Sequence, residues 1–238
     1  MQSKAWILLR AWVVIAGFAA WALAVIQAFR GELLWAGACV VFALAADAAG
    51  RVWSHKSPVP MPHFMRWVLL LPRGPHSPKY LKQVLQPRSG ERILEIGPGV
   101  GVHALPIASS LVPGGVLDVL DVQQEMLDDL VRRARRSGIT NIVPIQGDAQ
   151  KLPYPDRTFD AAYLIGVLGE IPDAALALRE LRRVLKPGGR LVIGEILIDP
   201  DFISLAALQE KARDASFMFE RSVGPGFAYT AVFRPAAV

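Results

Sequence analysis

The apolar positions of this 238-residue chain follow two contrasting patterns. Residues 11–29 form a run of nineteen uncharged residues between Arg10 and Arg30, and a second uncharged run covers residues 33–46. A helix of that first length rises about 28 Å, at roughly 1.5 Å per residue, which matches the hydrocarbon core of a bilayer. Beyond residue 90, short apolar runs alternate with amphipathic stretches, a pattern typical of an α/β domain.

The short apolar runs predict a parallel sheet whose strands are separated by helices. We expect strands at residues 92–96, 116–121, 142–145, 159–164 and 190–196. We expect helices at residues 78–85, 102–111, 124–137 and 174–184. The tail predicts a helix at 203–215, followed by strands at 217–222 and 228–233. The link between these last two strands is short enough for an antiparallel hairpin.

The most informative motif joins the first expected strand to the next helix. Glu95 lies at the end of an apolar run, and Gly97, Gly99 and Gly101 follow at alternate positions. Glycine lets the backbone approach a ligand because it has no Cβ. A second apolar run ends in Asp121, whose carboxylate can accept hydrogen bonds from both ribose hydroxyls. These parts form a nucleoside-binding βαβ unit, although the spacing G-x-G-x-G differs from the dinucleotide fingerprint G-x-G-x-x-G.

A glycine-rich turn taken alone is equally consistent with close packing of a helix on a strand, so the later segments carry the argument. Gly147-Asp148-Ala149 follows the third expected strand, and Lys186-Pro187-Gly188-Gly189 precedes the fifth. With these motifs in order, residues 81–234 resemble the class I S-adenosylmethionine-dependent methyltransferases, in the type 11 group that includes quinone-biosynthesis methyltransferases. The resemblance implies a Rossmann-like α/β fold with a seven-stranded sheet and a reversed C-terminal edge strand. It also implies S-adenosylmethionine as cofactor.

The same resemblance implies a cofactor site made of four groups of residues. The methionine part would lie on Glu95, Gly97, Gly99 and Gly101, and the ribose would bind Asp121. The adenine ring would lie beside Val122 and Met126, and its amino group would meet Asp148 beside Ala149. For Asp148, an Asx turn or a helix cap is the alternative explanation.

Methyl transfer needs few protein groups. The sulfonium is already activated, so alignment of the acceptor supplies much of the catalysis, and a base is needed only if the acceptor must lose a proton. Many relatives carry a histidine pair near Gly169 and Glu170, and this chain lacks it. The candidates for proton transfer are His76, His103, Tyr163 and Glu170.

Charge is unevenly distributed along the chain. Residues 51–92 contain eight Lys or Arg and the single acid Glu91, whereas residues 93–238 contain fifteen basic and eighteen acidic residues. The formal charge of +5 is therefore concentrated beside the apolar runs, as the positive-inside rule expects for a hairpin with both ends in the cytoplasm. Such a cluster attracts anionic lipid. Nucleic acid is the competing partner of a basic chain, but no recognisable binding module is present, so we expect a membrane and no nucleic acid.

Three segments are expected from these patterns. Residues 1–50 would form a two-helix transmembrane hairpin, with a signal peptide or a buried soluble hairpin as alternatives. Residues 51–78 are a Pro-rich basic connector, and residues 79–238 the S-adenosylmethionine-binding domain. The apolar piece 64–71 of the connector either packs on the domain as core, which we favour, or lies in the bilayer interface. In related methyltransferases this region covers the acceptor site, which makes Arg73, His76 and Tyr80 candidates for lining it.

The single cysteine, Cys39, allows no disulfide within the chain and no cysteine metal site, and no metal is expected.

Taken together, the motifs and the apolar runs predict a methyltransferase at the cytoplasmic face of a membrane that acts on a lipophilic small molecule or lipid. The alternatives are methylation of a soluble metabolite or protein, and a membrane-tethered cofactor-binding protein without turnover. The acceptor, its reacting atom, the span of residues 33–50 and the oligomeric state stay open.

Overall fold

The computed structural model describes residues 4–71 and 74–236, apart from the side chains of residues 4–11 and 14. The chain divides into two compact units, residues 1–62 and residues 63–238. Each unit is described by itself.

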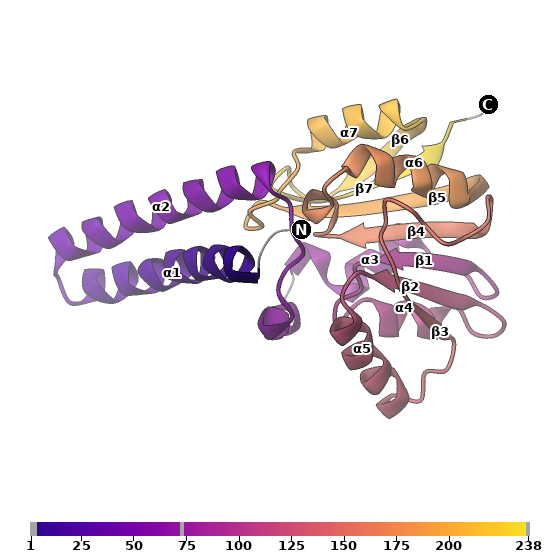
Figure 1. The fold of residues 1–238 in the computed structure, drawn as a ribbon, viewed down its shortest axis with the longest axis horizontal. Coiled ribbons are helices and arrows are strands. Elements are labelled where there is room, and N and C mark those ends of the chain that lie inside the picture. The colour runs from indigo at the N-terminus through magenta and orange to yellow at the C-terminus, as the bar shows by residue number, and fades with distance from the viewer. Residues whose placement is uncertain (1–3, 72–73, 237–238) are drawn as a thin grey trace. The chain divides into compact units, whose positions relative to one another are not determined.

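The first unit is a pair of helices, α1 (Lys4–Phe29) and α2 (Leu33–Lys56), which run side by side in Figure 1. Small residues fill the space between them, with Ala20, Ala24, Ala36 and Ala43 buried. The large apolar side chains point outward instead. Helix α2 is long and apolar enough to cross a membrane, and the described part of α1 contains the shorter apolar helix Ile15–Phe29.

The second unit begins with short helices in a proline-rich stretch. They are η1 (His63–Leu70), η2 (Gly74–His76) and α3 (Pro78–Leu85). We call residues 63–71 the strap. No residue of η1 is buried, and Phe64, Trp67 and Leu70 are exposed. The expectation that this apolar piece packs as core is therefore wrong: only part of it touches the domain.

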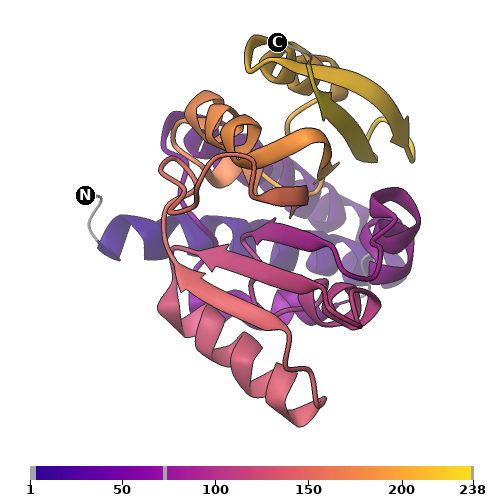
Figure 2. The same cartoon turned by 90° about the vertical axis from the view of Figure 1, so that its right-hand side faces the viewer.

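A seven-stranded sheet forms the centre of the second unit (Figures 1 and 2). Its strands are β1 (Arg92–Ile96), β2 (Val116–Asp121), β3 (Ile142–Gln146), β4 (Phe159–Ile165), β5 (Leu185–Ile196), β6 (Phe217–Val223) and β7 (Ala228–Pro235). The spatial order is β3-β2-β1-β4-β5-β7-β6. Strands β1 to β5 are parallel, and β7 is antiparallel to both of its neighbours. The reversed C-terminal strand is thus present, and β6 covers its outer side.

Helices cover both faces of this sheet. They are α4 (Ala104–Ser110), α5 (Gln124–Arg136), α6 (Ala174–Val184) and α7 (Leu205–Asp214), together with the short η3 (Leu168–Glu170). One core contains Leu178 of α6 and Leu208 of α7, and the other contains Leu85 of α3, Ile107 of α4 and Leu130 of α5. The strand order reverses between β1 and β4, so a crevice is expected at the carboxyl ends of these two strands.

Candidate cofactor site

The glycine-rich loop after β1 lies at this crevice. Gly97 and Gly99 have φ values of +64° and +52°, a left-handed conformation that favours glycine. A Cβ on Gly97 would lie 2.6 Å from a methyl carbon of Val167, and one on Gly99 would lie 2.5 Å from Cδ1 of Leu69. The loop is therefore closely covered by two segments: the link after β4 on one side and the strap on the other.

Asp121 connects this loop to the end of β2. Its carboxylate accepts hydrogen bonds from the backbone N–H groups of Gly99, Val122 and Gln123, the last at 2.9 Å. Only 8% of the residue is exposed. Burial raises the pKa of Asp121, although the three N–H donors favour its charged form. The two elements expected to hold the methionine part and the ribose are therefore fixed to each other through one carboxylate.

Glu95, at the end of β1, has a fixed orientation. The Tyr163 hydroxyl donates a hydrogen bond to Oε2 of Glu95 at 2.7 Å, and both side chains are buried. Burial, together with the nearby Glu95, raises the pKa of Tyr163 well above its ordinary value. In this geometry Tyr163 stays protonated and acts as a donor to Glu95.

The residues expected around the adenine lie at the ends of β2 and β3. The backbone N–H of Gly147 donates to the carbonyl of Asp121 at 3.0 Å, which joins these two strand ends. Met126 and Ala149 are buried, whereas Val122 is exposed. Asp148 is exposed and accepts the backbone N–H of Gln150 at 2.8 Å, which is the Asx-turn geometry given above as its alternative role. An exposed turn carboxylate remains able to meet a ligand, so its assignment to adenine stays a prediction.

The fold brings together two of the proposed proton-transfer residues, His76 and His103. His103 and His76 are both buried, and each Nε2 donates to a backbone carbonyl, that of His76 at 2.7 Å and that of Tyr229 at 3.0 Å. The histidines thus link η2 to the start of α4 and to β7. Glu170 is half-buried in η3 and Tyr80 is half exposed, while Arg73 lies outside the described residues. Their roles in transfer stay predictions.

Sequence reasoning missed several residues that hold the loop. One of them is Arg133 of α5, whose Nη1 donates to the carbonyl of Val100 at 2.7 Å. On the same helix, Asp129 accepts from Nε2 of His63 at 2.8 Å and lies 3.1 Å from Nε of Arg66. These contacts join residues 33 to 66 positions apart, so no local pattern marks them.

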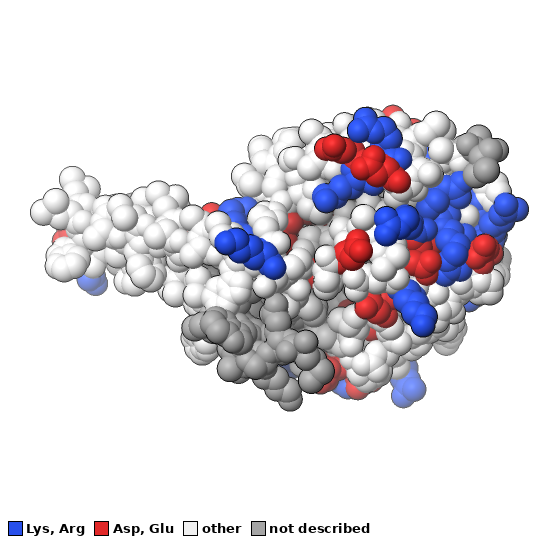
Figure 3. Space-filling model, turned by 45° about the horizontal axis from the view of Figure 1, so that its top comes forward, with Lys and Arg blue, Asp and Glu red and all other residues white. Residues whose placement is uncertain are grey.

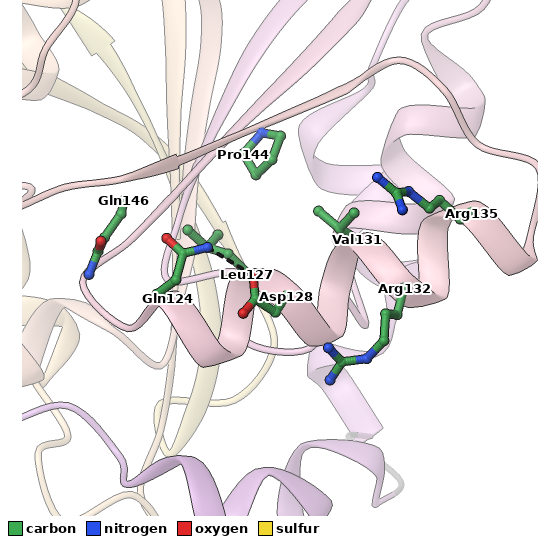
Figure 4. A pocket seen from close by; sticks show the side chains of 8 residues that line it. All are labelled: Gln124, Leu127, Asp128, Val131, Arg132, Arg135, Pro144 and Gln146. Atoms are coloured by element: carbon green, nitrogen blue, oxygen red, sulfur yellow. Dashed lines mark hydrogen bonds between the residues drawn. The ribbon is translucent and has the colours of Figure 1, made fainter.

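A groove of about 310 Å³ runs between α5 and β3 on the outer edge of the sheet (Figure 4). None of the residues expected to bind the cofactor lines it. Its walls are formed by Gln124, Leu127, Asp128, Val131, Arg132, Arg135, Pro144 and Gln146.

The central part of this unit is similar in sequence to known proteins. Residues 94–193 match the methyltransferase domain family. The 27-O-demethylrifamycin SV methyltransferase of Amycolatopsis mediterranei is 35% identical over 138 residues, which cover 56% of this chain and 49% of that protein. A ubiquinone/menaquinone biosynthesis C-methyltransferase of Saccharophagus degradans is 38% identical over 128 residues, which cover 53% and 49%. The chain thus spans about half the length of these curated relatives.

A solved structure is similar to a larger part of the chain. The S-adenosylmethionine-dependent methyltransferase of Aquifex aeolicus matches with a TM-score of 0.67 and 21% identity, covering 74% of this chain and 98% of that one. At this identity the match concerns the fold. The two proteins thus share the seven-stranded α/β fold.

Proposed function

We propose that this protein is an S-adenosylmethionine-dependent methyltransferase held at the cytoplasmic face of a membrane, and that it acts on a lipophilic small molecule or lipid. The observation that carries the proposal is the bond between Asp121 and the Gly99 N–H, since it fixes the glycine-rich loop against the carboxylate that would hold a ribose. When bound, the cofactor supplies a methyl group already activated by a sulfonium.

The residues of the site fit this cofactor. Asp121 and Glu95 supply two buried carboxylates at the ends of neighbouring strands, and the carboxylate of Glu95 is held in place by Tyr163. A fixed, buried carboxylate is suited to an ammonium group such as that of the methionine part. The chain's remaining contribution to transfer is to hold the acceptor in line and to exclude water.

The helical pair supports attachment to a membrane. Its outward side chains are large and apolar, with Phe29 at 89% and Leu34 at 92% exposure, while small alanines lie between the helices. Soluble proteins rarely expose large contiguous apolar patches, and small residues at a helix–helix contact are typical of membrane helices. The face of the pair seen in Figure 3 is almost entirely uncharged. A lipophilic acceptor is proposed because enzyme and substrate would then share one membrane. One curated relative is named for 27-O-demethylrifamycin SV and the other for ubiquinone/menaquinone biosynthesis.

Calorimetry on the full-length protein in detergent micelles tests the first part. We expect micromolar binding of S-adenosylmethionine, weakened at least tenfold in Asp121→Ala and unchanged in Asp214→Ala, an exposed control in α7. No binding by the wild type would refute the assignment.

Incubation with labelled methyl donor and either membrane lipid and quinone extracts or soluble extracts tests the acceptor. Label in the lipid fraction supports the proposal, and label in soluble metabolites or protein overturns the lipophilic acceptor. Binding without any transfer indicates a tethered cofactor-binding protein.

A further inference from the structure

The strap has two chemically different faces. Its inner side contacts the domain: His63 and Arg66 meet Asp129 of α5, and Leu69 lies against Gly99. Its outer side carries Phe64, Trp67 and Leu70, followed by Leu71, each between 43% and 60% exposed. Four large apolar side chains within eight consecutive residues thus face away from the described part of the domain.

The chemistry of this outer face suits a lipid surface better than water. Tryptophan has an apolar ring with a polar N–H, and it gathers at membrane–water interfaces for that reason. Phenylalanine and leucine beside it supply the apolar part of an interfacial segment. An acidic or polar partner protein would leave these side chains without apolar contact.

Chain length places this face near a membrane if α2 crosses one. Helix α2 ends at Lys56 and the strap begins at His63, so seven Cα–Cα steps separate them. Such a connection spans at most about 25 Å. This step rests on the membrane attachment proposed above; given that attachment, the strap cannot leave the neighbourhood of the lipid headgroups.

Charge specifies the kind of lipid. Residues 51–90 contain seven Lys or Arg and no Asp or Glu, and they include both sides of the strap. Basic clusters of this kind are attracted to anionic headgroups, and the attraction falls with added salt.

We infer that the strap is an interfacial element that docks through Phe64, Trp67, Leu70 and Leu71 into the headgroup region of an anionic bilayer, while Leu69 remains on Gly99. The glycine-rich loop is then held directly beneath the lipid surface. An acceptor dissolved in the bilayer reaches the site without crossing bulk water.

Site-specific quenching tests this inference on the full-length protein in a Cys39→Ala background. A fluorophore is attached through Trp67→Cys, through Leu44→Cys in α2, or through Ser109→Cys on the exposed side of α4. The protein is reconstituted in phosphatidylcholine–phosphatidylglycerol vesicles containing lipid with a nitroxide near the headgroup. Because Trp67 is exposed, its replacement leaves the fold intact, and Leu70→Cys provides a second strap position.

We expect strong quenching at positions 67 and 70, and none at position 109. A second lipid, with its nitroxide deep in the acyl chain, reports on position 44. If this lipid quenches position 44 but position 67 is no more quenched than position 109, strap docking is overturned and the membrane anchor stands. Position 44 unquenched by that lipid, with 67 still quenched, would support docking and refute the span. Quenching at position 67 that does not fall when phosphatidylglycerol is omitted would overturn the role of anionic lipid.

Discussion

The Tyr163 hydroxyl donates to Oε2 of Glu95 at 2.7 Å inside the second unit, where both side chains are shielded from water. One side chain comes from the end of β1 and the other from the neighbouring strand β4. The strand order reverses between these two strands, so this hydrogen bond lies below the crevice in which a nucleoside cofactor is expected.

Replacing Tyr163 with Phe should weaken cofactor binding. The variant keeps the ring but removes the donor, and a buried carboxylate that loses a hydrogen bond loses its fixed orientation. We expect the affinity for S-adenosylmethionine to fall by about 1–2 kcal/mol, or roughly tenfold, measured by calorimetry. Tyr80→Phe, at a half-exposed position, is the matched control. Equal affinities in the two variants would show that Glu95 needs no positioning by Tyr163.

Replacing Gly99 with Ala should destabilise the second unit more than replacing Gly138. Both glycines have positive φ, and an alanine in this conformation costs about 1–2 kcal/mol. A Cβ at Gly138 meets nothing within 4 Å, whereas a Cβ at Gly99 meets Leu69 at 2.5 Å. We expect a lower thermal midpoint for Gly99→Ala than for Gly138→Ala.

Addition of Leu69→Ala to Gly99→Ala should then relieve the steric part of the loss. The double variant is compared with Leu69→Ala alone, so that the cost of removing the leucine is subtracted. A double variant whose two losses are simply additive would mean that the strap does not press on the loop.

Acid should release the strap from α5. Partial burial alone would raise the pKa of Asp129, but the hydrogen bond from His63 and the charges of Arg132 and Arg66 hold it below its ordinary value. A lowered folded pKa means that this contribution is present above the unfolded value, about 3.9, and is lost as the pH falls through the folded one. We expect proteases to cleave the wild type within residues 63–71 faster in acid than at neutral pH. In Asp129→Asn we expect this faster cleavage already at neutral pH. Asp128→Asn, one position earlier, should keep the wild-type pattern.

Glu195→Gln should stabilise the protein at neutral pH. Burial, reinforced by Asp199, raises the pKa of Glu195 well above its ordinary value, and its Oε1 has no hydrogen-bond partner among the described residues. A raised folded pKa gives stability that is present below the unfolded value, about 4.3, and is lost as the pH rises.

Between the unfolded pKa and the raised folded pKa of Glu195, the wild type should therefore lose up to about 1.4 kcal/mol of unfolding free energy per pH unit relative to Glu195→Gln. Chemical denaturation across pH measures the difference, with the exposed Glu210→Gln as control. Parallel pH curves for wild type and Glu195→Gln would contradict a buried neutral acid.

Local patterns predicted the elements well where sequence neighbours decide them. The predicted limits of β1, β2, α3 and α6 coincide with the observed ones, because each is bounded by glycine, proline or a change of period. Strand β5 was expected from Arg190 but begins at Leu185, which pairs with Phe159 ahead of a register shift. A pairing between residues so far apart in sequence leaves no mark on the periodicity.

The site was predictable to a different depth for each of its parts. The spacing of the glycines and the carboxylate at a strand end predicted that the loop and Asp121 lie together, and the hydrogen bond from Gly99 joins them. That they bind the methionine part and the ribose stays a prediction. The bond of Arg133 to Val100 and the cover of Leu69 over Gly99 depend on how helices and loops meet in space. The strap was expected to be core because it is apolar. Its eight-residue 3₁₀ helix lies on the domain with one side only, and none of its residues is buried.

The contact of Leu69 with Gly99 has a kinetic meaning. If a cofactor binds on this loop as proposed, its exchange requires Leu69 to move away from Gly99, because the leucine occupies the space beside that residue. The rate of that movement would then set an upper limit on turnover, whatever the speed of methyl transfer. A lipid composition that binds the strap more tightly would slow that movement, so the bilayer would limit the turnover of the proposed enzyme.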